Sequence, residues 1–313
     1  MLPDSFSSKL RVILHILTES WILAPAEYPF ADKFKEVPPE RWNDLIANVD
    51  SDSQFELKEF IRRLNNSNIF WPEGKKLCFM MRSEYAIDKF PIAGKSRELK
   101  QLQRRFSLSG GEESLRFHHG AALLSEKAKL YIHDKVIVDA GACFGDFTIP
   151  VVFAYSPRHV LAFEPNVNST RKLVKNLKRN KIPLDRCRIF NAALGDCEQE
   201  VFFDSSDIRM DQPGKMRTVI RPLDDIETIM DHPVGLIKAD VEGMGTELLR
   251  GAVKTIEKFR PILALSCYHS EAELFGQYQF VTENFSNYQI SFTALPPGSG
   301  FEFTMLAVPG ELC

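Results

Sequence analysis

The chain lacks several features that assign a sequence to whole classes of proteins. Its 313 residues include six cysteines with no C-x-x-C pair and no regular spacing, which argues against a disulfide framework. Histidine and cysteine do not cluster at metal-ligand spacing, so we predict no metal site. Lysine plus arginine (39) nearly balance aspartate plus glutamate (42), which gives no overall attraction to nucleic acid. We therefore expect a cytoplasmic protein with reduced thiols and no nucleic-acid partner.

A long apolar run is also missing. The stretch Leu10–Ala24 is apolar in tone, but Arg11, His15 and Glu19 interrupt it. It is too short and too charged to cross a bilayer, and it does not have the layout of a secretory leader. We expect an amphipathic helix packed on its own protein and no membrane span. Nothing in the composition determines whether the chain forms a homo-oligomer.

The most informative segment lies near the middle of the chain. Val136–Ala140 is typical of a buried strand, and Gly141 and Gly145 predict a tight turn into a helix. Glu164 stands at the end of the next predicted strand, where an acid can bind ribose hydroxyls. The glycines are spaced G-x-x-x-G rather than G-x-G-x-x-G, which argues against a pyrophosphate-binding loop. Together with Asp139, this loop suits S-adenosylmethionine, which carries a cationic amino-acid end and no phosphate.

Further motifs follow in a fixed order, namely Asn191–Asp196, the D-V-E-G block within Leu236–Gly243, and L-R-G-A at Leu249–Ala252. In this order the motifs resemble those of the FkbM family of S-adenosylmethionine-dependent methyltransferases, over roughly Arg116 to Val308. Two positions depart from the family pattern. Cys143 stands where asparagine is common, and Gly245 stands where a second acid usually follows D-V-E-G.

Strand and helix patterns alternate from Lys135 onward, which predicts an α/β fold with a parallel sheet covered by helices on both faces. The resemblance implies a Rossmann-like, doubly wound, mostly parallel seven-stranded sheet, the class I methyltransferase fold. We expect one helix over Thr246–Lys258, an added pair of strands at Glu200–Phe203 and Met216–Arg221, and a final hairpin from Gln289 to Val308. We divide the chain into a helical N-terminal extension (1–111), a candidate acceptor cap, and a methyltransferase domain (112–313). Within the extension, helices are expected at Leu10–Ala24 and at Phe55–Leu64, the latter capped by Ser51-Asp52-Ser53.

Ligands of open α/β sheets bind at the carboxyl ends of the strands. This rule and the resemblance select the residues expected to bind the cofactor, with Glu164 holding the ribose through its two acceptor oxygens. Asn191 and Ala192 are expected near the adenine, although a simple strand-to-loop turn would explain them nearly as well. The predicted cofactor-binding residues are Asp139, Gly141, Ala142, Cys143, Phe144, Gly145, Asp146, Glu164, Pro165, Asn166, Asn191, Ala192, Ala193 and Asp240.

Three residues are predicted to be catalytic. Asp240 and Glu242 follow a buried strand that also contains Lys238, where charge is costly unless it is paired or functional. Asp240 could face the methyl donor, orient an acceptor hydroxyl or bind a divalent cation, and the sequence leaves a metal requirement open. Both residues could instead cap the helix that begins near Thr246. His269 follows the next strand and could accept the proton released on methyl transfer to a hydroxyl, or it could be structural.

These observations predict an S-adenosylmethionine-dependent O-methyltransferase. The resemblance implies an acceptor hydroxyl on a saccharide, a glycolipid precursor or a polyketide-like small molecule. A module that binds the cofactor without catalysis is one alternative, and a nicotinamide-dependent oxidoreductase is another.

Overall fold

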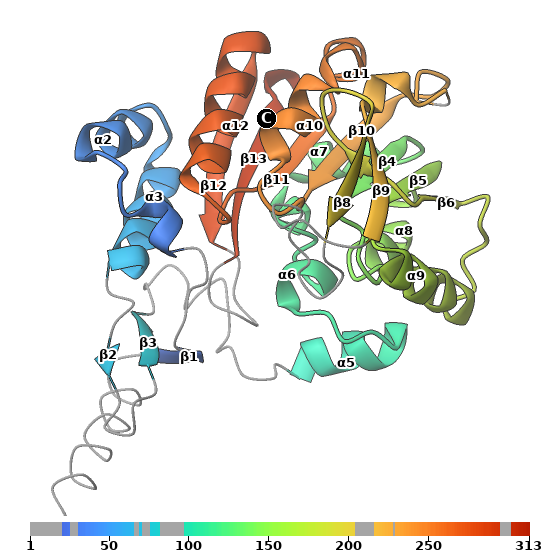
Figure 1. Ribbon diagram of the computed structural model, residues 1–313, viewed down its shortest axis with the longest axis horizontal. Coiled ribbons are helices and arrows are strands. Elements are labelled where there is room, and N and C mark those ends of the chain that lie inside the picture. Colours follow the sequence, from blue (N-terminus) through green and yellow to red (C-terminus); the bar gives the residue numbers. More distant parts are fainter. Residues whose placement is uncertain are drawn as a thin grey trace, which may run out of the picture.

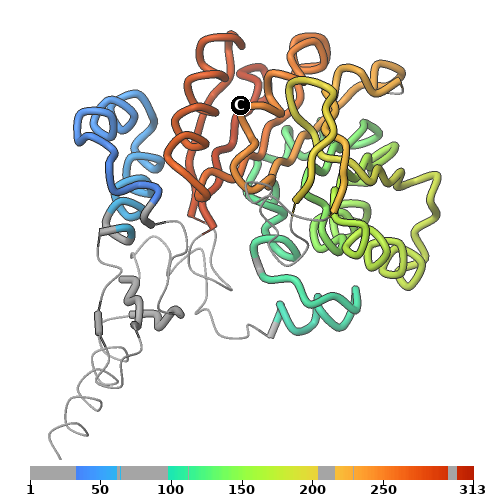
Figure 2. The backbone as a smooth tube through the Cα atoms, viewed as in Figure 1, coloured from blue at the N-terminus to red at the C-terminus, as the bar shows by residue number. Residues whose placement is uncertain are grey.

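The computed structural model describes residues 31–65, 97–203, 216–227, 229–294 and 302–313, together with the backbone of three strands nearer the N-terminus. Figure 1 shows the helices and strands, and Figure 2 follows the path of the backbone. Among the described residues, no helix combines the length and the apolar character needed to cross a membrane.

A seven-stranded sheet forms the centre of the molecule, in the order β12-β13-β11-β10-β4-β5-β6. Strand β13 runs antiparallel to both of its neighbours, and the other pairings are parallel. This confirms the predicted mostly parallel, doubly wound sheet and its final hairpin. The strands are β4 (Val136–Ala140), β5 (His159–Phe163), β6 (Cys187–Phe190), β10 (Val234–Ala239), β11 (Ile262–Ser266), β12 (Tyr288–Ala294) and β13 (Phe303–Pro309).

Helices cover both faces of this sheet (Figure 1). All residues of β4, β10 and β11 are buried, and successive β4 residues point into different cores: Ile137 packs on one face, Val136 and Val138 on the other. Burial on both faces explains why these strands are continuously apolar. The first face packs against α7 (Glu126–Ile132), α8 (Thr148–Tyr155) and α9 (Val167–Arg179), and the second against α10 (Gly245–Arg250), α11 (Val253–Phe259) and α12 (Glu271–Asn284).

The prediction of a single helix over Thr246–Lys258 is wrong, because the chain breaks into α10 and α11 at Gly251 and Ala252. A Cβ atom on Gly251 would lie 1.9 Å from the carbonyl oxygen of Gly195. The carbonyl of Gly251 also accepts a hydrogen bond from the backbone of Asp224 at 2.9 Å. The L-R-G-A motif therefore marks a close backbone contact and not the interior of a helix.

A second, small sheet lies beside the main one. The added strands are confirmed as β8 (Gln199–Phe203) and β9 (Met216–Arg221), which pair antiparallel, and β7 (Ala193–Leu194) joins β9 in parallel. Residues 204–215, between β8 and β9, and 295–301, between β12 and β13, lie outside the described residues.

The described part of the N-terminal segment contains strands as well as helices. The described helices are α2 (Pro39–Ala47), α3 (Ser51–Asn65), α5 (Arg97–Phe106) and α6 (Glu112–Leu115). Strands β1 (Trp21–Pro25), β3 (Lys76–Met81) and β2 (Ile69–Phe70) form an antiparallel sheet. The prediction of a helix over Leu10–Ala24 is therefore wrong from Trp21 onward, where β1 begins. Residues 10–20 lie outside the described part. Helix α3 confirms the one predicted at Phe55–Leu64. Its cap is Asp50, which accepts a hydrogen bond from the Ser53 backbone at 2.7 Å.

Helix α3 packs directly against β12, an outer strand of the main sheet. The ring of Phe60 stacks on Phe303 with centroids 4.4 Å apart. The hydroxyl of Ser53 accepts a hydrogen bond from the β12 backbone at Phe292 (2.8 Å), and Glu56 accepts one at Ala294 (3.4 Å). Part of the extension thus shares the core of the sheet, while the domain boundary near residue 111 stays a prediction.

Candidate active site

The turn after β4 brings two strand ends together. Gly141 has φ +75, and a Cβ atom there would lie 1.9 Å from the carbonyl oxygen of Asp240. The Asp240 backbone N–H donates to the carbonyl of Ala140 at 3.1 Å. Glycine is therefore required at position 141, because any side chain would push the ends of β4 and β10 apart.

Glu164, at the end of β5, is held across this turn. One of its carboxylate oxygens accepts the backbone N–H of Cys143 and the other accepts that of Asn166, both at 2.8 Å. Burial raises the pKa of Glu164, and these two donors act in the opposite direction. Because Cys143 contributes its backbone, cysteine in place of the family's asparagine leaves this contact in place.

A pocket of about 160 Å³ opens between the ends of β4, β5 and β10. Among the predicted residues, those that line it are Gly141, Cys143, Glu164, Pro165, Ala193, Asp240 and Glu242. The prediction missed Phe163, Leu194, Val241 and Met244. The first three are apolar residues directly next to predicted ones, so extending each motif by one residue would have found them.

Other predicted cofactor residues lie behind the pocket wall or beside it. Asn166 caps α9 by accepting from the backbone N–H groups of Asn168 and Ser169. Asn191 donates to the carbonyls of Glu164 (2.8 Å) and Pro165 (3.0 Å), so it supports the Glu164 turn. Ala142, Gly145 and Ala192 do not line the pocket, and Phe144 and Asp146 face a separate hollow against α9.

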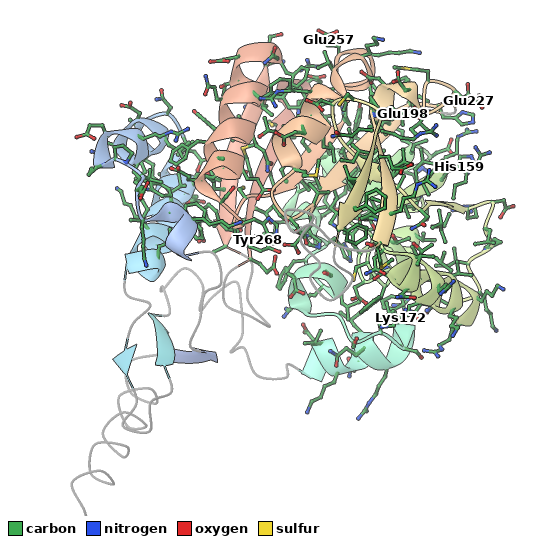
Figure 3. The ribbon with its side chains drawn as sticks, in the orientation of Figure 1. His159, Lys172, Glu198, Glu227, Glu257 and Tyr268 are labelled. Atoms are coloured by element: carbon green, nitrogen blue, oxygen red, sulfur yellow. The ribbon has the colours of Figure 1, made fainter. Side chains whose placement is uncertain are left out.

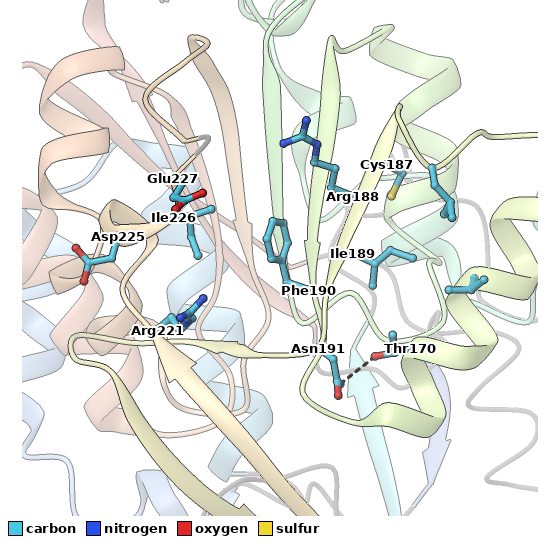
Figure 4. A pocket seen from close by; sticks show the side chains of 12 residues that line it. Thr170, Cys187, Arg188, Ile189, Phe190, Asn191, Arg221, Asp225, Ile226 and Glu227 are labelled. Atoms are coloured by element: carbon cyan, nitrogen blue, oxygen red, sulfur yellow. Dashed lines mark hydrogen bonds between the residues drawn. The ribbon is translucent and has the colours of Figure 1, made fainter.

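A larger hollow of about 700 Å³ lies at the β6 edge of the sheet (Figure 4). It is lined by Phe190, Asn191, Arg221 and Glu227 among others, and Figure 4 shows Asn191 bonded to Thr170. Two of the three predicted catalytic residues, Asp240 and Glu242, line the smaller pocket instead, while His269 lies behind them and lines neither hollow.

Asp139 does not face the pocket as predicted. It is fully buried and accepts hydrogen bonds from Thr148 (2.5 Å) and from the ammonium of Lys238 (3.1 Å). Lys238 also donates to the carbonyls of Ala140 (3.2 Å) and Gly141 (2.8 Å). Burial opposes the charge, yet Asp139 and Asp240 raise the pKa of Lys238. This buried ion pair fixes the turn that forms the pocket floor.

Carboxylates surround His269. Its Nδ1 lies 2.7 Å from Glu273, and its Nε2 lies 3.4 Å from both Asp240 and Glu242. Burial disfavours the charged imidazole, but the three carboxylates outweigh it and raise the pKa to about 9. A pKa above neutrality favours the positively charged imidazolium at neutral pH, which suits an ion-paired structural histidine better than the proton acceptor predicted from the sequence.

Asp240 is the centre of this cluster. The hydroxyl of Tyr268 donates to its Oδ1 at 3.2 Å. Burial opposes ionisation, but Lys238 and His269 lower the pKa of Asp240, so it is a carboxylate. Glycine at position 245 has a local reason, because a Cβ atom there would lie 2.3 Å from the amide nitrogen of Gln277.

The sheet order, the reversed strand β13 and the glycine turn facing an acid define a class I methyltransferase fold. Within it, residues 139–292 match the family model described as "Methyltransferase FkbM domain", so this part of the chain belongs to the FkbM methyltransferase family.

A solved structure agrees with this fold. A methyltransferase FkbM from Methylobacillus flagellatus superposes with a TM-score of 0.57 at 19% identity, covering 89% of this chain and 60% of its own. The chain thus spans about 60% of the length of that protein. An O-methyltransferase from Bacillus cereus is more distant, with a TM-score of 0.44 at 14% identity over 72% of this chain and 96% of its own. One from Streptomyces achromogenes has a TM-score of 0.42 at 11% identity over 72% of this chain and 95% of its own. No curated protein matches the sequence significantly.

Proposed function

We propose that the chain is an S-adenosylmethionine-dependent O-methyltransferase that acts on a hydroxyl of a saccharide, a glycolipid precursor or a polyketide-like small molecule. The observation that carries this proposal is the position of Glu164. Two backbone donors fix it opposite Gly141, in the pocket that also contains Asp240 and Glu242. An acid in this place can bind ribose hydroxyls next to a second pair of carboxylates.

The backbone amides of the glycine turn favour this cofactor over a dinucleotide. The N–H groups of Gly141 and Ala142 both donate to the carbonyl of Phe163 at 3.0 Å, and that of Cys143 donates to Glu164. A pyrophosphate needs such amides pointing toward it, and here the protein itself uses them. The acidic pocket instead suits a ligand with a cationic sulfonium and ammonium.

Methyl transfer from this donor requires alignment more than activation, because the sulfonium is already reactive. The acceptor oxygen attacks the methyl carbon in line, the carbon–sulfur bond breaks, and its electron pair remains on sulfur. We assign the released proton to Glu242, whose side chain lines the pocket, is 25% exposed and contacts charged His269. Its φ of +54 is unfavourable for a non-glycine residue, which is a form of strain found at functional sites.

Calorimetric titration of the full chain tests the proposal. We expect S-adenosylhomocysteine to bind and NAD not to bind, and Glu164→Gln should weaken the first interaction about 10- to 100-fold through loss of charged hydrogen bonds. Glu227→Gln is the control, since this exposed acid lines the larger hollow. Tight NAD binding, or equal S-adenosylhomocysteine affinity in Glu164→Gln and wild type, would refute the assignment. Formation of S-adenosylhomocysteine with hydroxylated acceptors separates an enzyme from a binding module.

A further inference from the structure

Three potential metal ligands from distant parts of the chain meet beside the proposed methyl-transfer position. His119 lies in the turn before α7, Asp240 follows β10, and Glu302 directly precedes β13. One ligand atom from each residue lies within 4.8 Å of the other two. His119 and Glu302 stand outside the segment that matches the FkbM family model.

The histidine has an unsatisfied buried nitrogen. His119 is 3% exposed, and its Nε2 lies 3.1 Å from the hydroxyl of Ser114. In the described part of the chain its Nδ1 has no hydrogen-bond partner. Leaving a buried polar atom without a partner destabilises the fold, so this nitrogen is a candidate to bind a ligand.

Glu302 and Asp240 offer matching oxygens. Oε2 of Glu302 is buried and, among the described residues, has no hydrogen-bond partner. The contacts of Asp240 with Tyr268 and His269 both use Oδ1, and one carboxylate oxygen of Asp240 lies within 4.8 Å of the ligand atoms of His119 and Glu302. A cation bound between these groups would satisfy the unpaired nitrogen and oxygen together.

The backbone at His119 supports this interpretation. His118, His119 and Gly120 have φ values of +50, +48 and +89, three left-handed residues in a row. Two of them carry side chains that disfavour this region. The strain is consistent with a segment shaped to position the His119 ring.

We propose that His119, Asp240 and Glu302 bind a divalent transition-metal cation. One imidazole and two carboxylates form a mixed nitrogen and oxygen set that suits Mn²⁺ or Zn²⁺. Three protein ligands leave coordination positions open, and Asp240 also lines the donor pocket. In the proposed methyl transfer, on which this step rests, the cation binds the acceptor oxygen. Coordination eases loss of the hydroxyl proton to Glu242. The resulting alkoxide forms the bond to the methyl carbon as the carbon–sulfur bond breaks and leaves its electron pair on sulfur.

Metal titration of the chelator-treated full chain tests this site without an acceptor. Free Mn²⁺ followed by electron paramagnetic resonance should reveal one bound ion per chain that Zn²⁺ displaces. His119→Gln and Glu302→Gln should each weaken Mn²⁺ binding at least 10-fold. Glu257→Gln is the matched control, because this exposed acid lies on α11, well apart from Tyr268 (Figure 3). Glu302→Asp provides a second variant that keeps the charge but shortens its reach, and it should also bind more weakly.

S-adenosylhomocysteine is titrated into the same samples, and unchanged affinity shows that the variants are folded. If wild type binds S-adenosylhomocysteine but neither Mn²⁺ nor Zn²⁺, the metal site is wrong while the proposed function stands. Equal Mn²⁺ affinity in wild type, His119→Gln and Glu302→Gln also overturns it. If wild type binds Mn²⁺ but no S-adenosylhomocysteine, loss of Mn²⁺ binding in variants that keep the wild-type circular dichroism spectrum would support the site and refute the proposed function.

Discussion

Replacing Lys238 with methionine should destabilise the protein more than any surface change. The substitution keeps the length of the side chain but removes its charge, and it leaves the Asp139 carboxylate fully buried with Thr148 as its remaining partner. The carbonyls of Ala140 and Gly141 lose the ammonium donor as well, although that of Ala140 keeps the backbone N–H of Asp240. Breaking a buried pair in this way costs about 3–5 kcal/mol. Because the pKa of Lys238 is raised, the stability that its ammonium adds to the fold is fully present at neutral pH and is lost only above about pH 10.

Urea denaturation at pH 7 measures this cost. Lys129→Met is the control, because Lys129 pairs with Glu126 at the surface, where such a pair contributes about 0.5 kcal/mol. The double variant Lys238→Met/Asp139→Asn removes the uncompensated charge and should recover part of the loss. If Lys238→Met costs no more than Lys129→Met, or if the double variant is less stable than Lys238→Met, the buried pair does not fix the turn.

Further expectations concern individual residues. The pKa of about 9 for His269 lies above the usual value of about 6.5. The stability that the charged imidazole adds to the folded protein is therefore fully present below pH 6.5 and is lost as the pH rises through 9. In denaturation experiments, wild type should lose roughly 3 kcal/mol relative to His269→Gln over this window, and parallel profiles would contradict the charged state. Cys143→Asn should bind S-adenosylhomocysteine within about twofold of wild type, because Glu164 is held by the backbone, and a tenfold loss would contradict this. The free energy of unfolding of this variant should also rise by about a few tenths of a kcal/mol, because asparagine adopts the φ of +45 at position 143 more readily than cysteine. Gly141→Ala should lose S-adenosylhomocysteine binding through displacement of Asp240, and retained affinity in calorimetry would show that the turn can adjust.

The sequence predicted what depends on local pattern. Runs of β-branched residues such as Val136–Val138 identified the buried strands, and the glycine turn and Glu164 identified the pocket. The break between α10 and α11 could not be predicted, because it depends on the backbone of Gly195 approaching Gly251 from a distant part of the chain.

Side-chain direction was the main limit at the site. Asp139 is close to the pocket in sequence, but it points into the core, where Lys238 neutralises it. The sequence predicted His269 to be a base. Its three carboxylate neighbours, which raise the pKa of the imidazole, come together only in the fold, so the sequence could not reveal them. His119 and Glu302 are separated by most of the chain, so no motif could link either of them to Asp240.

The contacts of Ser53 and Glu56 with β12 have a consequence for solubility. An outer strand with open N–H groups is a template for aggregation, and α3 occupies those groups at Phe292 and Ala294. Shortening the chain to the predicted methyltransferase domain (112–313) would remove α3 and uncover both groups together with the aromatic face around Phe303. A truncated form for crystallography should therefore keep α3. Among the described strands, this leaves β6 as the outer strand of the main sheet to which another strand can add.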